Sequence, residues 1–118
     1  MKYLCLIYIE EKKLEAVAKN EMDALMEETS AYNEMLQQSG HLISTAGLQP
    51  VQTATTLRMR KGKLSITDGP FAETKEVLGG FYVIEARDLN EAIQLASKSP
   101  SLRIGSVEVR PIDELIQP

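Results

Sequence analysis

The chain has 118 residues and a formal net charge of −4, with charged and apolar fractions that are ordinary for a soluble globular protein. This length fits one domain with a single core, which we expect to span residues 1–118. The acidic balance argues against nucleic-acid binding, because nucleic-acid-binding domains normally present a basic face. No apolar run approaches the roughly 20 residues of a membrane-spanning helix. We therefore predict a cytoplasmic protein, in which the single cysteine, Cys5, is a buried and inert thiol.

The first predicted element is a strand at residues 2–9, whose two alternating faces are both apolar. Such a strand is typical of a sheet that is covered on both sides. Residues 10–19 are charged and fit either a short helical turn or a loop. A helix follows, with Asn20 as its predicted N-cap and Gly40 as the left-handed residue that ends it. Its predicted buried face has 3.6-residue spacing and consists of Met22, Leu25, Met26, Thr29, Tyr32, Met35 and Leu36.

A strand at residues 42–48 and a hairpin are predicted next. The first hairpin strand, residues 55–60, alternates polar and apolar side chains. Lys61-Gly62 is a tight-turn signal, and residues 64–67 return as the partner strand. The hairpin side chains that we expect to point inward are Leu57 and Met59.

The second half of the chain predicts a strand, a helix and a strand. Residues 80–86 form another strand that is apolar on both faces. Asp88 is the predicted cap of the helix, with Glu91 three residues later, and Pro100 prevents any extension. The expected buried side of this helix consists of Leu89, Ala92, Ile93, Leu95 and Ala96. Residues 106–111 form the last predicted strand.

Without the hairpin, these elements follow the order βαββαβ, which is the ferredoxin-like arrangement. Its first and third strands lie in the middle of the sheet, and these are the two segments with apolar residues on both faces. Both helices pack on one face, so Val83 and either Phe81 or Tyr82 would be left in water with half of the first strand. Exposed apolar surface of this extent usually marks an interface. We therefore predict an α+β fold with an added hairpin, forming a homodimer through its sheet faces.

The loop at residues 68–76 is the strongest candidate for a functional site. Its Asp-Gly turn is stiffened by Pro70, and charge-dense loops on a rigid scaffold often carry function. The alternative is a structural turn with solvated charges. Asp68 is the candidate catalytic residue, because burial would raise the pKa of its carboxyl and make it a general base. The alternative for Asp68 is an Asx turn, in which its side chain accepts a backbone N–H.

The other candidate residues surround this loop in the sequence. We expect Glu73 and Lys75 to form an ion pair or to bind an anionic ligand, and Phe71 to anchor the loop in the core. Arg58, Lys75 or Tyr82 would orient an anionic group of a ligand. His41, the single histidine, is either an acid–base group or an exposed turn residue. No metal-binding pattern and no phosphate-binding glycine loop is present.

Several segments resemble the DGPF family, which is part of the wider YCII-like group. They are residues 1–8, 48–50, 54–58, 68–76, 79–88 and 105–111, with the Asp68-Gly69-Pro70-Phe71 core as the most specific motif. The resemblance runs nearly end to end and implies a dimeric α+β barrel. DGPF proteins look like companions of extracytoplasmic-function sigma factors, which implies a role in signalling.

The wider YCII-like group is associated with a His–Asp pair at its proposed active site. The aspartate of that pair resembles Asp68, but its histidine lies within the first helix, ahead of the glycine that ends it. In this chain Thr29, Ser30 and Asn33 occupy that region, and His41 follows Gly40. The incomplete pair weakens the case for hydrolytic or dehydrochlorinating chemistry by analogy with the group.

Two functional hypotheses remain. The favoured one is a homodimeric module, without a cofactor, that binds a small polar or anionic ligand or regulates another protein. The alternative is a cofactor-independent enzyme, of isomerase, lyase or hydrolase type, in which Asp68 is the acid–base residue for a small polar or aromatic substrate. The second rests on analogy at the level of the fold, and fold does not fix function.

Overall fold

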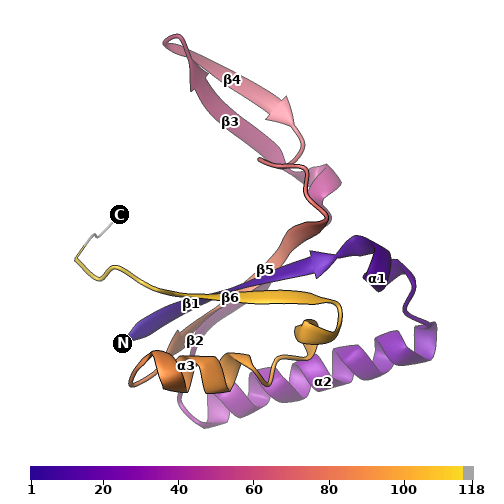
Figure 1. Cartoon of the computed structure of the whole chain (residues 1–118), viewed down its shortest axis with the longest axis vertical. Coiled ribbons are helices and arrows are strands. Elements are labelled where there is room, and N and C mark those ends of the chain that lie inside the picture. Colours follow the sequence, from indigo (N-terminus) through magenta and orange to yellow (C-terminus); the bar gives the residue numbers. More distant parts are fainter. Residues whose placement is uncertain (116–118) are drawn as a thin grey trace.

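The computed structural model describes residues 1–115 as a four-stranded antiparallel sheet with helices on one face and a separate two-stranded arm (Figure 1). The sheet order is β2-β5-β1-β6, the order of the ferredoxin-like plan. The elements are β1 (Lys2–Glu10), α1 (Glu11–Glu15), α2 (Lys19–Gln38), β2 (Leu42–Gly47), β3 (Thr55–Arg60), β4 (Lys63–Asp68), β5 (Glu76–Glu85), α3 (Leu89–Ala96) and β6 (Gly105–Pro111), with short 3₁₀ helices at Val51–Thr53 and Pro100–Arg103.

The core lies between the sheet and helices α2 and α3. Alternate residues of β1 are buried there, and Cys5 is among them, where burial raises the pKa of its thiol to about 11. The central position of β1 and β5 confirms the prediction from their apolar sequences. Leu36 of α2 is fully buried at the middle of this layer. The other core residues are Tyr3, Ile7, Tyr32, Tyr82, Ile84, Ala86, Ala92, Leu95 and Ala96.

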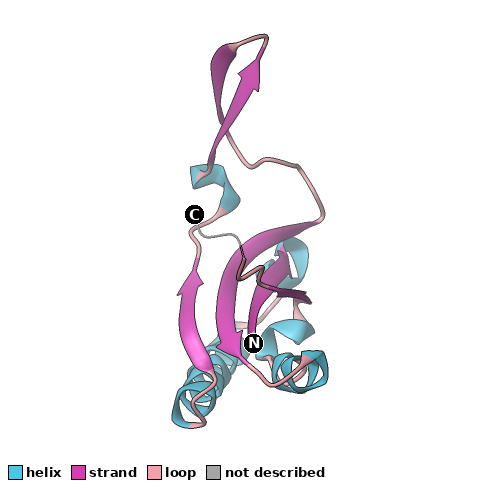
Figure 2. Cartoon of the chain, turned by 90° about the vertical axis from the view of Figure 1, so that its left-hand side faces the viewer, coloured by secondary structure: helices cyan, strands magenta, loops and turns pink. Residues whose placement is uncertain are grey.

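The opposite face of the sheet, called the open face below, carries no helix (Figure 2). Cross-strand pairs Leu6–Phe81 and Leu4–Val83 lie on it, together with Tyr8, and all five residues are half-buried. Within residues 1–115 the helices cover one side of these strands, as the predicted βαββαβ order requires, and cover of the other side stays a prediction that depends on the homodimer. Both crossover helices of this fold lie on the same side of the sheet.

The helix boundaries follow from local hydrogen bonds. The Asp88 carboxylate accepts the Glu91 backbone N–H at 2.9 Å, which confirms the predicted cap of α3. Gly40 has φ +79°, as predicted for the residue that ends α2. Asn20 as N-cap is wrong, because α2 begins at Lys19 and Ala18, two residues earlier, holds the cap position without a side-chain bond.

Three apolar helix residues predicted to be buried lie outside the core. Met26 of α2 is 63% exposed, and Leu89 and Ile93 of α3 are about half exposed. In α3 the contact with the sheet is made through the small side chains of Ala92 and Ala96, which are both buried. The flanking residues of the helix therefore remain at its solvent side.

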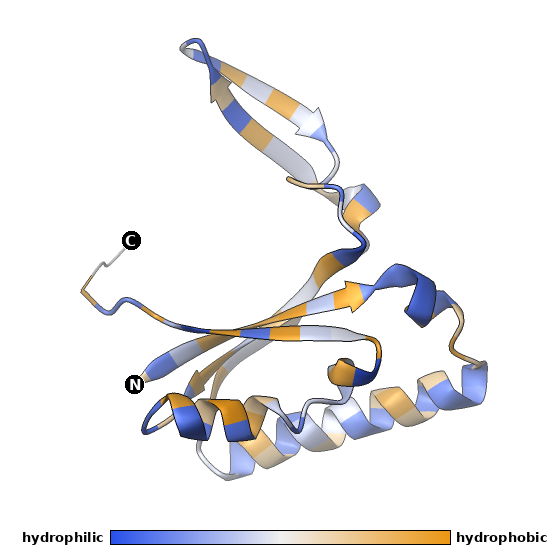
Figure 3. Cartoon of the chain, viewed as in Figure 1, coloured by the Kyte–Doolittle hydropathy of each residue, from blue (hydrophilic) through white to orange (hydrophobic). Residues whose placement is uncertain are grey.

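The β3–β4 hairpin forms an arm that projects from the sheet on the side away from the helices (Figures 1 and 2). Its tip is a tight turn with positive φ at both Lys61 and Gly62, which confirms the predicted turn. Apolar and polar residues alternate along both strands (Figure 3). The prediction that Leu57 and Met59 point inward is wrong, because they are 59% and 69% exposed. Among residues 1–115 no second layer covers the apolar face of this two-stranded arm.

Replacing Tyr32 by Phe tests the contact between helices α2 and α3. The Tyr32 hydroxyl donates a buried hydrogen bond of 2.8 Å to the Leu95 carbonyl oxygen in the last turn of α3. Its loss should lower the free energy of unfolding by about 1–2 kcal/mol, measured by urea denaturation. Tyr8→Phe is the matched control, because the Tyr8 hydroxyl makes no hydrogen bond within residues 1–115. Equal stability of both variants would contradict the assignment.

Candidate functional site

A cavity of about 760 Å³ lies at the corner where the arm leaves the sheet. Its walls come from the open face, from the segment after β2, from the base of the arm and from the loop of residues 69–75. The lining is mostly apolar, and this volume is typical of sites for small molecules. The principal apolar residues are Leu48, Pro50, Val51, Leu57, Pro70, Phe71, Val77 and Leu78.

The turn at Gly69-Pro70 fixes the angle between the arm and the sheet. Gly69 has φ +114°, a conformation that side-chain-bearing residues rarely adopt. Its N–H donates to the Ala54 carbonyl oxygen at 2.8 Å, and its own carbonyl oxygen accepts the Thr56 hydroxyl at 2.8 Å. The turn is therefore joined to the base of β3, and the ring of Pro70 fixes its own φ and restricts Gly69 before it. These constraints build one wall of the cavity.

Arg58 and Phe71 meet at this turn. The guanidinium carbon lies 5.0 Å from the centre of the Phe71 ring, and Arg58 Nη2 donates to the Phe71 carbonyl oxygen at 3.0 Å. This geometry is a cation–π contact. Phe71 was predicted to anchor the loop in the core, and that is wrong, because it is 77% exposed. The arm carries the loop away from the core, so the ring stacks against Arg58 instead.

Lys75 pairs with Glu10, so the predicted Glu73–Lys75 pair does not form. Lys75 Nζ lies 3.2 Å from Glu10 Oε1, and Lys13 Nζ lies 3.4 Å from Glu10 Oε2. Glu10 is 8% exposed, and its burial alone would raise its pKa; hydrogen bonds and positive charges from the two lysines outweigh burial and lower it. Glu73 is exposed and makes no polar contact within residues 1–115. The Lys75–Glu10 pair ties the loop to the end of β1.

Asp68 is exposed at the end of β4. Its carboxylate makes no hydrogen bond or ion pair with any described residue, so the Asx-turn alternative is wrong. The structure also does not bury this carboxylate, as a general base in a protected site would require. Its catalytic role stays a prediction.

Tyr82 faces the helices and does not line the cavity. Its ring packs edge-on against Tyr32, with centroids 5.5 Å apart, and its hydroxyl donates to Asn33 Oδ1. Burial is the main cause that raises the pKa of Tyr82. The structure therefore separates Tyr82 from Arg58 and Phe71, with which it was grouped by sequence. Its neighbour Phe81 occupies the open face.

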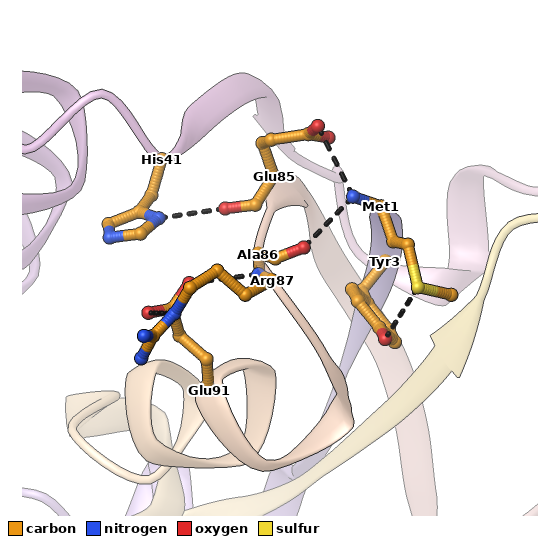
Figure 4. Close-up of polar contacts among 7 residues, drawn as sticks. All are labelled: Met1, Tyr3, His41, Glu85, Ala86, Arg87 and Glu91. Carbon is orange, nitrogen blue, oxygen red and sulfur yellow. Dashed lines mark hydrogen bonds and ion pairs between the residues drawn. The ribbon is translucent and has the colours of Figure 1, made fainter.

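His41 lies at the other end of the sheet, in a polar cluster around Glu85 (Figure 4). His41 Nδ1 is 2.7 Å from the Glu85 carbonyl oxygen, and the amino group of Met1 pairs with the Glu85 carboxylate at 3.2 Å. The ten residues of β5 span about 30 Å. The cavity lies at the start of this strand, and Glu85 lies at its end. The structure therefore does not bring His41 to Asp68.

Tyr8 is the site residue that the sequence analysis missed. It lines the cavity from the open face, and its hydroxyl has no hydrogen-bond partner among the described residues. Gln49 and Thr55 are two further lining residues whose side chains make no hydrogen bond there. The signal for Tyr8 was the alternation of β1, which places it on the same face as Leu4 and Leu6. Within residues 1–115, no three His, Cys, Asp or Glu side chains are grouped so that they could hold a metal ion.

Comparison with known proteins gives the family. The profile of the YCII-related domain matches residues 1–116. The chain belongs to the YCII-related family. An uncharacterized protein of Rhizobium meliloti (strain 1021) is 40% identical over 116 residues, covering 95% of this chain and 92% of the relative.

A solved structure similar to this YCII-related chain is that of 5-chloro-2-hydroxyhydroquinone dehydrochlorinase from Burkholderia phenoliruptrix AC1100, in complex with 2,5-dihydroxybenzoquinone. The two are 13% identical, with a TM-score of 0.49, and the match covers 96% of this chain and 94% of the other. The family is thus given by sequence, and the fold by the order of the strands. No helix of the described part of the chain is both long and apolar enough to span a membrane.

The ion pairs of Glu10 predict a specific loss of stability in acid. Because the folded pKa of Glu10 is below its unfolded value of about 4.3, its contribution is complete above that value and is lost as the pH falls through the folded pKa. The melting temperature of Glu10→Gln should therefore be below that of the wild type at pH 7, and the difference should shrink below about pH 4. Glu73→Gln should match the wild type throughout. A Glu10→Gln difference that stays constant from pH 7 to pH 3 would contradict the assignment.

Proposed function

We propose that this YCII-related protein is a homodimeric binding module, and that its ligand is a small, uncharged, largely apolar molecule with hydroxyl or carbonyl groups. The observation that carries the proposal is the cavity at the base of the arm, with its apolar lining and its few unsatisfied polar groups. Pockets of this kind are the usual sites of small-molecule recognition.

The lining defines the chemical class of the ligand. The hydroxyls of Thr53, Thr56 and Thr74 already donate to backbone carbonyl oxygens, whereas Tyr8 and Thr55 retain free hydroxyls within the described residues. These groups can orient one or two polar atoms of an otherwise apolar molecule. Glu76 is the charged residue of the lining, and it would repel an anion. The cavity therefore favours an uncharged ligand over the anionic one that the sequence left open.

Binding is better supported than the catalysis predicted for Asp68. A proton-transfer enzyme needs an acid or base within hydrogen-bond reach of its substrate and with a pKa adjusted to the task. Asp68 does not line the cavity, and its carboxylate is exposed. Arg58 stacks on the Phe71 ring and Lys75 forms an ion pair with Glu10.

The open face supports the homodimer. Its central residues Leu4, Leu6 and Phe81 form an apolar surface, and Val83 and Tyr8 extend it. An isologous contact would place the same surface of a second copy on it, because a twofold axis pairs each surface with itself. Two sheets that pack face to face in this way form the dimeric α+β barrel that the family resemblance implies.

Binding of 2-naphthol, an uncharged aromatic alcohol, tests the cavity. Titration calorimetry should detect binding to the wild type, and Ala72→Trp should weaken it at least about tenfold by filling the space. Ala24→Trp on α2 makes the same change at an exposed position away from the cavity and should bind as the wild type does. Equal affinities of the two variants, or no binding by the wild type, would refute the proposed site.

Sedimentation equilibrium tests the homodimer. The wild type at micromolar concentration should have twice the chain mass of 13.1 kDa. Leu6→Glu should shift it to the monomer, because the substitution buries an unpaired charge in the interface. Leu89→Glu introduces the same charge on the helix side and should remain dimeric. A folded wild-type protein that sediments as a monomer would refute the dimer.

A further inference from the structure

The arm exposes an apolar face that no residue of the described range, 1–115, covers. Leu57 lies opposite Ile66, and Met59 lies opposite Leu64, so all four side chains are on the same face of the hairpin. Each of them is between 57% and 69% exposed. An isolated two-stranded hairpin is marginally stable in water. The arm therefore needs a surface against which this face can pack.

The apolar face of the arm and the open face of the sheet belong to one concave surface. Leu57, at the base of the arm, lines the cavity together with Tyr8 of the open face. The arm rises on the side of the sheet that carries no helix (Figures 1 and 2). A protein that covers the open face therefore lies beside the arm as well.

The distribution of charge favours a second copy of the chain as that protein. Residues 55–68 contain four of the 13 basic residues and one of the 17 acidic residues, so the arm has a formal charge of +3. The rest of the chain, with nine basic and 16 acidic residues, has a formal charge of −7. Each arm of a dimer would thus lie beside an oppositely charged body, and such complementarity speeds association and fixes orientation.

The extent of the surface also fits a dimer. Complete burial of a large aliphatic or aromatic side chain removes on the order of 100 Å² of apolar surface. The arm and the open face together offer nine such side chains per subunit, each partly exposed. This gives several hundred Å² of apolar contact, the same order as the roughly 800 Å² per partner of a specific interface.

We infer that the arm is a clamp for a second copy of the chain, and that the clamped subunit forms the missing wall of the cavity. This inference rests on the proposed homodimer and adds two statements to it. The interface includes the arm as well as the sheet, and the ligand site is complete only in the dimer. Phe71, which is 77% exposed at the mouth of the cavity, is covered in the assembly.

Dimerisation and ligand binding are then linked. A ligand that binds the dimer better than the monomer strengthens the dimer by the same factor by which the dimer strengthens ligand binding. Substitutions on the distal part of the arm should therefore weaken ligand binding without touching the cavity. Met59 and Leu64 are suitable positions, because neither lines it.

The experiment compares Met59→Glu with Met26→Glu. Both positions carry a methionine with similar exposure, 69% on the arm and 63% on α2, and both variants receive the same charge. In sedimentation equilibrium, Met59→Glu should raise the dimer dissociation constant at least about tenfold, since the change enters the interface twice. At a protein concentration where the variant is monomeric, its affinity for 2-naphthol should fall several-fold. Met26→Glu should retain both wild-type values.

The outcomes separate this inference from the homodimer itself. If the wild type is a dimer and Met59→Glu dimerises as tightly as Met26→Glu, the clamp is refuted and the sheet-face dimer stands. If Met59→Glu is monomeric but binds 2-naphthol like the wild type, the partner does not complete the cavity. A monomeric wild type refutes both the homodimer and the clamp. A wild type that binds no 2-naphthol refutes the cavity as a ligand site and, with it, the completion of that site by the partner. If circular dichroism shows that Met59→Glu does not fold, Leu64→Glu on the paired strand replaces it. Leu64→Glu should then give the results predicted for Met59→Glu.

Discussion

The pairing of β1 with β5 is the constraint on which the rest of the structure depends. Both strands are apolar on both faces, but the crossover helices of this topology cover only one face. The covered side supplies the core, including Cys5 and Tyr82, and the other side leaves Leu6 and Phe81 half-buried. One sequence feature, apolar residues at successive positions, therefore builds the core on one side of the sheet and leaves the proposed dimer surface on the other.

The arm depends on the end of the same ladder. β1 and β5 are paired as far as Glu10 and Glu76, and Lys75 binds Glu10 where the pairing ends. The loop before Lys75 turns at Gly69, which bonds to the base of the arm. The arm thus meets the sheet at an angle set by a positive φ, a proline and an ion pair. Its orientation, and with it the cavity, follows from the loop rather than from a packed core.

The sequence predicts the elements better than it predicts which surfaces they cover. Alternation with a period of two identifies the faces of a strand, and the tight turn at Lys61-Gly62 fixes the register of the arm. Neither signal tells whether another layer lies against a given face, so the inward prediction for Leu57 failed. For the same reason Tyr82 was predicted as a site residue. It lies on the helix side of β5, and its neighbour Phe81 lies on the open face. The Asp88 cap was predictable because its partner is three residues away and no distant contact decides it.

The hydroxyl groups of the interior are bonded within the protein, whereas the cavity offers a hydroxyl that can bind a ligand. The Tyr32 hydroxyl donates to the Leu95 carbonyl oxygen, and the Tyr82 hydroxyl donates to Asn33 Oδ1. The first bond joins α2 to α3 and the second joins β5 to α2, so both hydroxyls are unavailable to a ligand. The cavity lies on the other side of the sheet and offers the free hydroxyl of Tyr8 in apolar surroundings. A hydroxyl in apolar surroundings can orient a ligand, because it both donates and accepts hydrogen bonds.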